Sequence, residues 1–158
     1  MAAWPGHTRN PVLPYPLLLI AHLFAAVMFV GAVFFEVLIL GSALERVPGG
    51  VKRRVESAVA QRARRLMPWV LAVLYASGLG MAWHYRAVLA QPLASSFALM
   101  LALKIALALS VLGHFIVAMR TRGRGQRIAR RFRRIHVSVF CHMLGIVLLA
   151  KGMFYLTG

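Results

Sequence analysis

The chain has 158 residues, of which 61% are hydrophobic and only 14% are charged, and its mean hydropathy is +0.75. Soluble domains carry about a quarter charged residues, so this composition excludes an ordinary soluble enzyme and a disordered tail. Nineteen Lys and Arg against three Asp and Glu give a formal charge of +16. A chain that is both this apolar and this basic must segregate the two properties, and the sequence therefore predicts an integral membrane protein.

Four apolar stretches are each long enough to cross a bilayer, which takes about 20 residues. They lie at 15–43, 66–89, 97–119 and 135–157. The sequence thus predicts an all-α fold, a four-helix membrane bundle formed by one domain over residues 1–158. The first stretch is longer than the apolar core of a signal peptide, which has about 7–15 residues, so we interpret it as a retained helix.

Fifteen of the nineteen basic residues lie in two blocks between these stretches, seven at 46–65 and eight at 120–134. Because Lys and Arg accumulate in cytoplasmic loops, we expect both blocks to be cytoplasmic and both termini to lie outside a bacterial inner membrane. Arg-rich runs also mark nucleic-acid binders. Beside membrane helices the same charge serves topology and binds anionic lipid, so the expected partner is membrane lipid and not nucleic acid.

Within the first basic block, apolar residues recur at helical spacing at Val51, Val55, Ala58 and Val59. This spacing predicts a short amphipathic helix in the cytoplasmic interface before the second span. Residues 121–125 contain two glycines and are predicted to form a loop. Cys141 is the only cysteine, which excludes an intrachain disulfide and a cysteine-based metal cluster.

Ionisable side chains inside a bilayer are costly, which makes each one a functional candidate. Besides Arg86, the apolar stretches contain His22, Glu36, His84, Lys104, His114, His136, His142 and Lys151. A rise of about 1.5 Å per residue brings His22, His84 and Lys104 into the outer half of the membrane. The same rise gives His114 and His142 a common depth in the inner half, on two antiparallel helices.

Histidines on several helices of a bundle are the axial ligands that haem iron uses. We therefore expect His22, His114 and His142 to be metal ligands, and Lys104 and His84 to complete a cofactor-binding site. The simpler alternative for each histidine is a neutral imidazole that is hydrogen-bonded to a neighbouring helix. Lys104 has three alternatives: an axial ligand, a partner for a haem propionate, or a side chain that extends to the membrane surface.

The sequence also resembles a known group of membrane proteins. Ala21-His22-Leu23-Phe24 and Gly31-Ala32-Val33-Phe34-Phe35 resemble the first helix of the HemJ and copper-resistance-protein-D-like families. Leu103-Lys104-Ile105 with Leu112-Gly113-His114 is similar to the third helix of HemJ, and the run Arg130–Ile135 is similar to the start of its fourth. His142 is additional to that pattern.

The resemblance implies a haem b protein of the inner membrane, with His22, Lys104 and His114 as the matching positions. In the HemJ family it further implies oxidation of a porphyrinogen, with electrons leaving through the membrane to an acceptor such as a quinone. In the copper-resistance branch it implies copper handling, which stays the alternative function. A bundle this small has little room to enclose a macrocycle, so we also expect a homodimer.

The charge distribution predicts the outcome of reporter fusions in a bacterial host. A periplasm-active phosphatase fused to the C-terminus should be active, whereas the same reporter fused after Arg124, inside the second basic block, should be inactive. Phosphatase activity in intact cells is the measurement. The reverse pattern would overturn the orientation and the depths assigned to every histidine.

Overall fold

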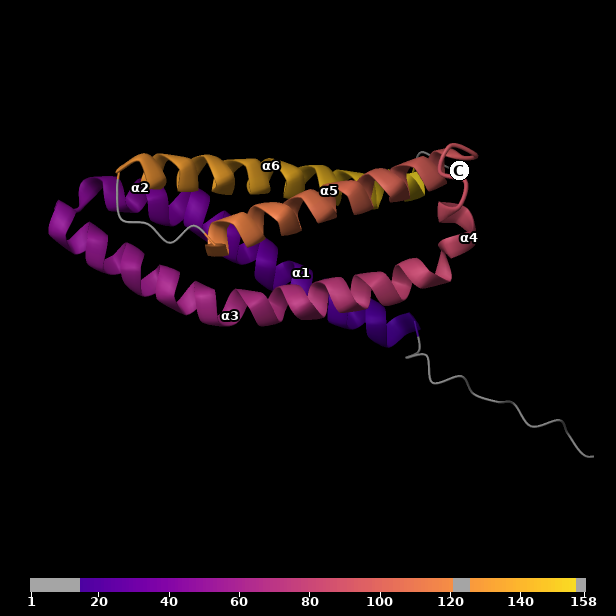
Figure 1. The fold of residues 1–158 in the computed structure, drawn as a ribbon, viewed down its shortest axis with the longest axis horizontal. Helices are drawn as coiled ribbons and strands as arrows, with labels where there is room; N and C mark the ends of the chain where they lie inside the picture. Colours follow the sequence, from indigo (N-terminus) through magenta and orange to yellow (C-terminus); the bar gives the residue numbers. More distant parts are fainter. Residues whose placement is uncertain (1–14, 121–125, 156–158) are drawn as a thin grey trace, which may run out of the picture.

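A computed structural model of the chain describes residues 15–120 and 126–155, with side chains described for 15–120 and 137–152. All regular elements in these ranges are helices, and no strand occurs among them (Figure 1). Three helices are long and apolar enough to cross a membrane: Tyr15–Arg46, Gly49–His84 and Ser96–Arg120. The expectation of an all-helical membrane protein is confirmed to this extent. The fourth apolar stretch, Val137–Gly152, is shorter, so the fourth span stays a prediction.

The first long helix changes its winding along its length without a break. α1 (Tyr15–Phe34) continues as a π-helix, η1 (Phe35–Leu40), then as α2 (Gly41–Ala43) and as a final 3₁₀ turn, η2 (Leu44–Arg46). In the π-helical segment the amide of Gly41 donates to the carbonyl of Glu36, five residues back. Such π turns are rare and usually short. The helix ends at Arg46, three residues beyond the predicted boundary at 43.

The second long helix differs from the prediction. α3 (Gly49–His84) is one continuous helix of 36 residues, which corresponds to about 54 Å, against a hydrocarbon core of about 30 Å. The expected interfacial helix is therefore not a separate element but the first half of α3. Because the helix does not break before Leu66, this half extends away from the membrane-spanning part and cannot turn to lie flat beside it.

The remaining helices follow the predicted order with shifted ends. α4 (Arg86–Leu89) is a single turn after α3, and α5 (Ser96–Arg120) begins where the hydroxyl of Ser95 accepts a hydrogen bond from the amide of Ala98, as a helix N-cap does. α6 (Gln126–Tyr155) starts nine residues before the predicted boundary at 135, so much of the second basic block is helical. The predicted loop at 121–125 lies outside the described residues.

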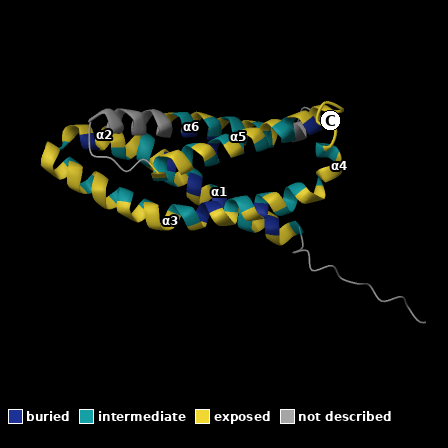
Figure 2. Ribbon diagram, in the orientation of Figure 1, coloured by how far each residue is buried: buried dark blue, intermediate teal, exposed yellow. Residues whose placement is uncertain are grey.

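The helices pack as two pairs, α1 with α3 and α5 with α6 (Figure 1). A single apolar core joins the pairs, and its buried members come from all four helices. They are Ala25, Phe29, Val33, Val70, Leu71, Val111, Val139 and Met143. The outer surface is also apolar: Trp69 is 75% exposed and Leu148 is 72% exposed (Figure 2). Large exposed apolar side chains on all four long helices, α1, α3, α5 and α6, fit a lipid solvent.

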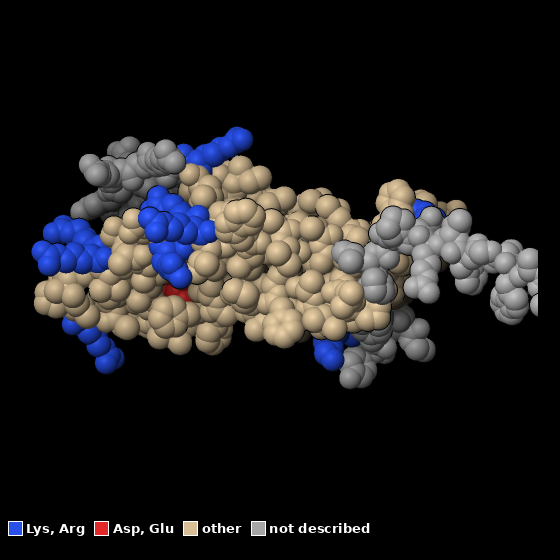
Figure 3. Space-filling model, turned by 90° about the horizontal axis from the view of Figure 1, so that it is seen from below, with Lys and Arg blue, Asp and Glu red and all other residues tan. Residues whose placement is uncertain are grey.

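Most of the charged side chains that the structure describes lie toward the ends of the molecule, and Lys104 on α5 is an exception. Figure 3 shows Lys and Arg side chains gathered toward the end where α2 meets the start of α3, with an uncharged belt over the middle of this face. We call this the basic end. It includes the exposed Arg53, Arg54, Arg62 and Arg65 of α3. An apolar belt between charged ends is the arrangement that a bilayer requires.

Close approach of α1 and α3 depends on two glycines of α3. A Cβ at Gly80 would lie 3.0 Å from a methyl carbon of Leu18, and a Cβ at Gly78 would lie 3.2 Å from the ring of His22. Small residues let membrane helices approach closely, and this contact replaces the hydrophobic driving force that operates only in water.

Gly80→Val is expected to destabilise the α1–α3 pair, because the new methyl groups would displace Leu18 and separate the helices. We expect a loss of about 1–3 kcal/mol in the free energy of unfolding, the usual cost of overpacking. Gly31→Val is the matched control, because a Cβ at Gly31 meets no atom within 4 Å. Unfolding in mixed detergent micelles measures both variants, and equal losses would show that the Gly80 contact is unimportant.

Candidate functional site

His22 lies on α1 against α3. Its Nδ1 lies 3.0 Å from the carbonyl oxygen of Leu74 and 3.4 Å from the hydroxyl of the buried Ser77. A carbonyl only accepts hydrogen bonds, so Nδ1 carries the proton and donates it. Nε2 then holds a lone pair. No described residue forms a hydrogen bond with Nε2 of His22.

Lys104 belongs to the other helix pair. It is half-buried on α5, and among the described residues no carboxylate forms an ion pair with its ammonium group. That Lys104 and His22 share one site stays a prediction. An ammonium group within an apolar helix is costly, which keeps Lys104 a functional candidate.

The other two candidate ligands, His114 and His142, meet between α5 and α6, with ring centroids 5.4 Å apart. Each Nδ1 donates to the carbonyl four residues back, that of Ser110 at 2.8 Å and that of Ser138 at 2.7 Å. Each Nε2 faces a serine hydroxyl on the opposite helix. Ser110 lies 3.1 Å from His142, and Ser138 lies 3.4 Å from His114. We call these four residues the Ser–His clasp.

The clasp is reciprocal, because each helix contributes the same Ser-x-x-x-His spacing and the two copies run antiparallel. All four ring nitrogens are used by hydrogen bonds, as neutral imidazoles with protonated Nδ1 require. Each Nε2 atom is held by a serine hydroxyl of the opposite helix. Among the residues that the structure describes, no three His, Cys, Asp or Glu side chains form a metal-binding group.

His84 is not brought to the His22 site. It is exposed at the end of α3, where its Nδ1 donates to the carbonyl of Gly80 at 2.9 Å. Its ring lies edge-on to Tyr15, with centroids 5.5 Å apart, and Tyr15 in turn contacts Tyr85. Aromatic groups of this kind accumulate at the membrane–water interface. This environment favours an interfacial role for His84.

The remaining ionisable residues of the apolar stretches are spread out. Glu36 is half-buried in the π-helix η1, and Lys151 is exposed on α6, as a side chain that extends to the membrane surface would be. The side chain of His136 lies outside the described residues.

Sequence reasoning missed two polar residues that connect helices. Ser110 forms half of the clasp, and the hydroxyl of Tyr75 on α3 donates to the carbonyl of Ala108 on α5 at 2.5 Å. The repeated Ser-x-x-x-His spacing at Ser110–His114 and Ser138–His142 was the available signal for Ser110. For Tyr75 the sequence held no such signal, because its hydrogen-bond partner is a backbone carbonyl.

Comparison with known proteins does not assign this site. No protein-family model matches the chain, and no curated protein and no solved structure matches it either. Its function must be argued from the residues themselves.

The clasp is expected to stabilise the α5–α6 pair. Ser110→Ala and His142→Ala should each lower the free energy of unfolding, and a double-mutant cycle between them should give a coupling of about 0.5–2 kcal/mol, the range for hydrogen bonds between membrane helices. Ser42→Ala is the matched serine control, because Ser42 is exposed and bonds only to carbonyls of its own helix. A cycle between Ser110 and Ser42 should show no coupling, and a Ser110–His142 coupling of zero would contradict the clasp.

Proposed function

We propose that the chain binds haem b through His22 and acts in electron transfer or a haem-linked oxidation at the inner membrane. The observation that carries the proposal is the state of the His22 ring. Its Nδ1 is fixed by the Leu74 carbonyl, and its Nε2 has no hydrogen-bond partner among the described residues. Histidines that bind metals characteristically donate their second ring N–H to a carbonyl or carboxylate, which sets the tautomer and orients the ring.

The three histidines expected as ligands do not fit haem equally. His22 fits, because its Nδ1 is fixed by the Leu74 carbonyl and no described residue forms a hydrogen bond with its Nε2. His114 and His142 do not fit as a ligand pair in the clasp, because their rings pack against each other and each Nε2 is held by a serine hydroxyl. The proposal therefore rests on His22 and gives the clasp the role of holding α5 against α6, with Lys104 on α5.

Lys104 supports the same proposal. An ammonium group in an apolar stretch that pairs with no carboxylate of the described residues favours an anionic group on a ligand, and haem carries two propionates. Bound haem would supply one-electron chemistry, with a potential set by its axial ligand and its apolar surroundings. The chain's own residues supply the rest: Leu74 orients His22, Lys104 neutralises a carboxylate, and the buried Ala25 and Phe29 next along α1 exclude water.

A homodimer is part of the proposal. Among the described residues one imidazole, that of His22, has an Nε2 without a hydrogen-bond partner, and α1 and α3 carry exposed apolar side chains such as Phe24 and Trp83 that a second copy of the chain can cover. A macrocycle shared between protomers would be covered on both sides, which one small bundle does not achieve. Native mass spectrometry of the haem-loaded particle would measure this, and a haem-replete monomer would contradict it.

His22→Ala should remove the haem, because the substitution deletes the nitrogen donor. The absorption spectrum of the purified protein, oxidised and then reduced with dithionite, measures this as loss of the Soret band and of the α and β bands. His84→Ala is the matched control and should leave the spectrum unchanged. Lys104→Ala should reduce haem retention, whereas Lys151→Ala should be silent. If the purified wild-type protein is colourless and contains copper, the haem proposal is wrong and the copper-handling function takes its place.

A further inference from the structure

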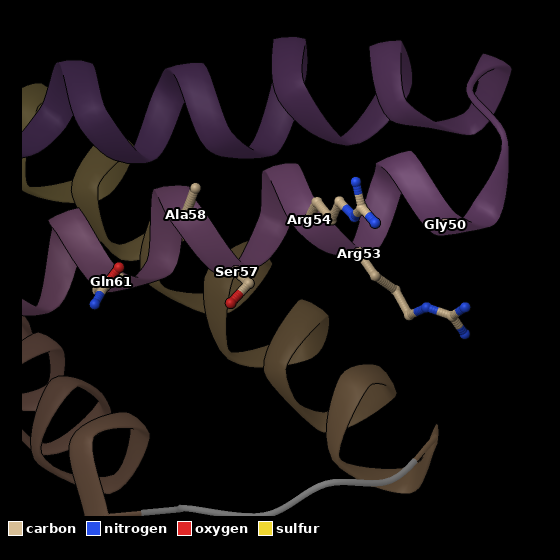
Figure 4. Close-up of a pocket in the computed structure, with 6 residues that line it drawn as sticks. All are labelled: Gly50, Arg53, Arg54, Ser57, Ala58 and Gln61. Carbon is tan, nitrogen blue, oxygen red and sulfur yellow. The ribbon is translucent and has the colours of Figure 1, made fainter.

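Polar residues of α3 gather in two places. The first is a surface depression on the first half of the helix, and Figure 4 shows Arg53, Arg54 and Ser57 among the residues that line it. All of its lining residues belong to α3, so the depression is open on its other sides. The second place is the turn at residues 74–78, which packs against His22 of α1. There, polar groups of two helices meet within the apolar part of the bundle.

Ser77 lies at the centre of this turn. Its side chain is 4% exposed, and it is the only buried polar side chain in the part of the chain that the structure describes. A hydroxyl has one proton to donate, whereas a carbonyl oxygen only accepts. The hydroxyl of Ser77 lies 2.6 Å from the carbonyl oxygen of Val73 and 3.1 Å from that of Leu74, so it donates its proton to this backbone. The oxygen of Ser77 keeps its lone pairs for another donor.

This proton assignment decides the direction of the contact with His22. Nδ1 of His22 lies 3.0 Å from the carbonyl oxygen of Leu74 and 3.4 Å from the hydroxyl oxygen of Ser77. An unprotonated Nδ1 would direct its lone pair at the lone pairs of that carbonyl oxygen, and the two would repel each other. A protonated Nδ1 instead donates to both oxygens in a three-centre hydrogen bond. Ser77 is therefore a second, more distant acceptor for the N–H of His22.

Gly78 provides the space in which the ring lies. A Cβ at Gly78 would lie 3.2 Å from Cε1 of the His22 ring and 3.4 Å from its Nδ1. The ring is rigid and is held by its hydrogen bond to Leu74, so it would have to move away from that carbonyl. At Gly80 a Cβ would lie 3.0 Å from the end of the Leu18 side chain, which is flexible and can rotate. The missing side chain of Gly78 is thus a condition for the His22–Leu74 hydrogen bond.

We propose that Ser77 and Gly78 are positioning residues, which fix the tautomer and the direction of the His22 ring and strengthen its Nε2 as an electron-pair donor. A hydrogen bond from the second ring nitrogen orients a histidine ligand and raises its basicity, and His22 has two acceptors for it. The inference rests on the proposed function only for its consequence at haem iron. The state of the ring is a property of the chain without haem.

The first arm of the test uses the full chain with isotope-labelled histidine, purified in detergent without haem. Nuclear magnetic resonance reads the protonation of each ring nitrogen, and His22→Ala assigns the His22 signal by its loss. The wild type should show one tautomer, protonated at Nδ1, with slow exchange of this proton with solvent. Gly78→Ala should accelerate the exchange about three- to tenfold, the effect of losing one hydrogen bond, and Ser77→Ala about twofold.

Matched variants separate positioning from general loosening of the bundle. Gly80→Ala adds the same methyl group to the α1–α3 contact, and Ser110→Ala removes a hydroxyl that faces a different histidine, His142. Both should leave the His22 signal unchanged. Ser77→Thr keeps the hydroxyl, which can bond to a carbonyl of its own helix, and should restore the wild-type exchange rate. Circular dichroism verifies that each variant keeps its helix content.

The second arm measures the consequence in the haem-loaded protein by spectroelectrochemical titration. A stronger donor stabilises oxidised iron, so Ser77→Ala should raise the reduction potential of the haem, and Ser77→Thr should leave it unchanged. Equal potentials in the wild type and in Ser77→Ala would show that Ser77 does not strengthen the donor.

Three results of the first arm would overturn the proposal. They are a wild-type ring that is protonated at Nε2, an unchanged exchange rate in both Gly78→Ala and Ser77→Ala, and an equal acceleration in Gly80→Ala and Ser110→Ala. A protein that gives the expected ring signals but binds no haem would contradict the proposed function and leave this inference standing.

Discussion

Hydrogen bonds between helices, made in an apolar solvent, are the constraint on which this structure depends. Lipid tails are as apolar as leucine side chains, so burial of apolar surface does not drive membrane helices together. Close packing and polar contacts decide which faces meet. In this chain His22 joins α1 to α3, Tyr75 joins α3 to α5, and the Ser–His clasp joins α5 to α6.

The same constraint divides the intramembrane histidines into two classes. A buried imidazole must satisfy both ring nitrogens or leave one for a ligand, because an unmet polar group costs free energy in an apolar medium. The clasp satisfies every ring nitrogen of His114 and His142 within the chain. His22 satisfies only Nδ1 among the described residues. This difference, and not the presence of histidine alone, makes His22 the functional candidate.

Charge is distributed very unevenly along the chain. Fifteen of the nineteen basic residues lie in the blocks at 46–65 and 120–134, whereas Lys104 is a rare charge within an apolar stretch. Most of the first block belongs to the continuous helix α3 and not to a separate interfacial helix. The charged first half and the apolar second half of α3 therefore have a fixed relation to each other.

The sequence by itself determined the all-helical class of the protein and its long apolar stretches. These follow from composition and periodicity, which are local. It also determined that His114 and His142 share a depth, since depth follows from residue counting. Only the tertiary structure decided that their Nε2 atoms bond to serines of opposite helices, that Tyr75 joins α3 to α5, and that α3 does not break before Leu66. Rotation of a helix about its axis and the continuity of a helix through its boundary depend on partners distant in the chain, and no local pattern encodes them.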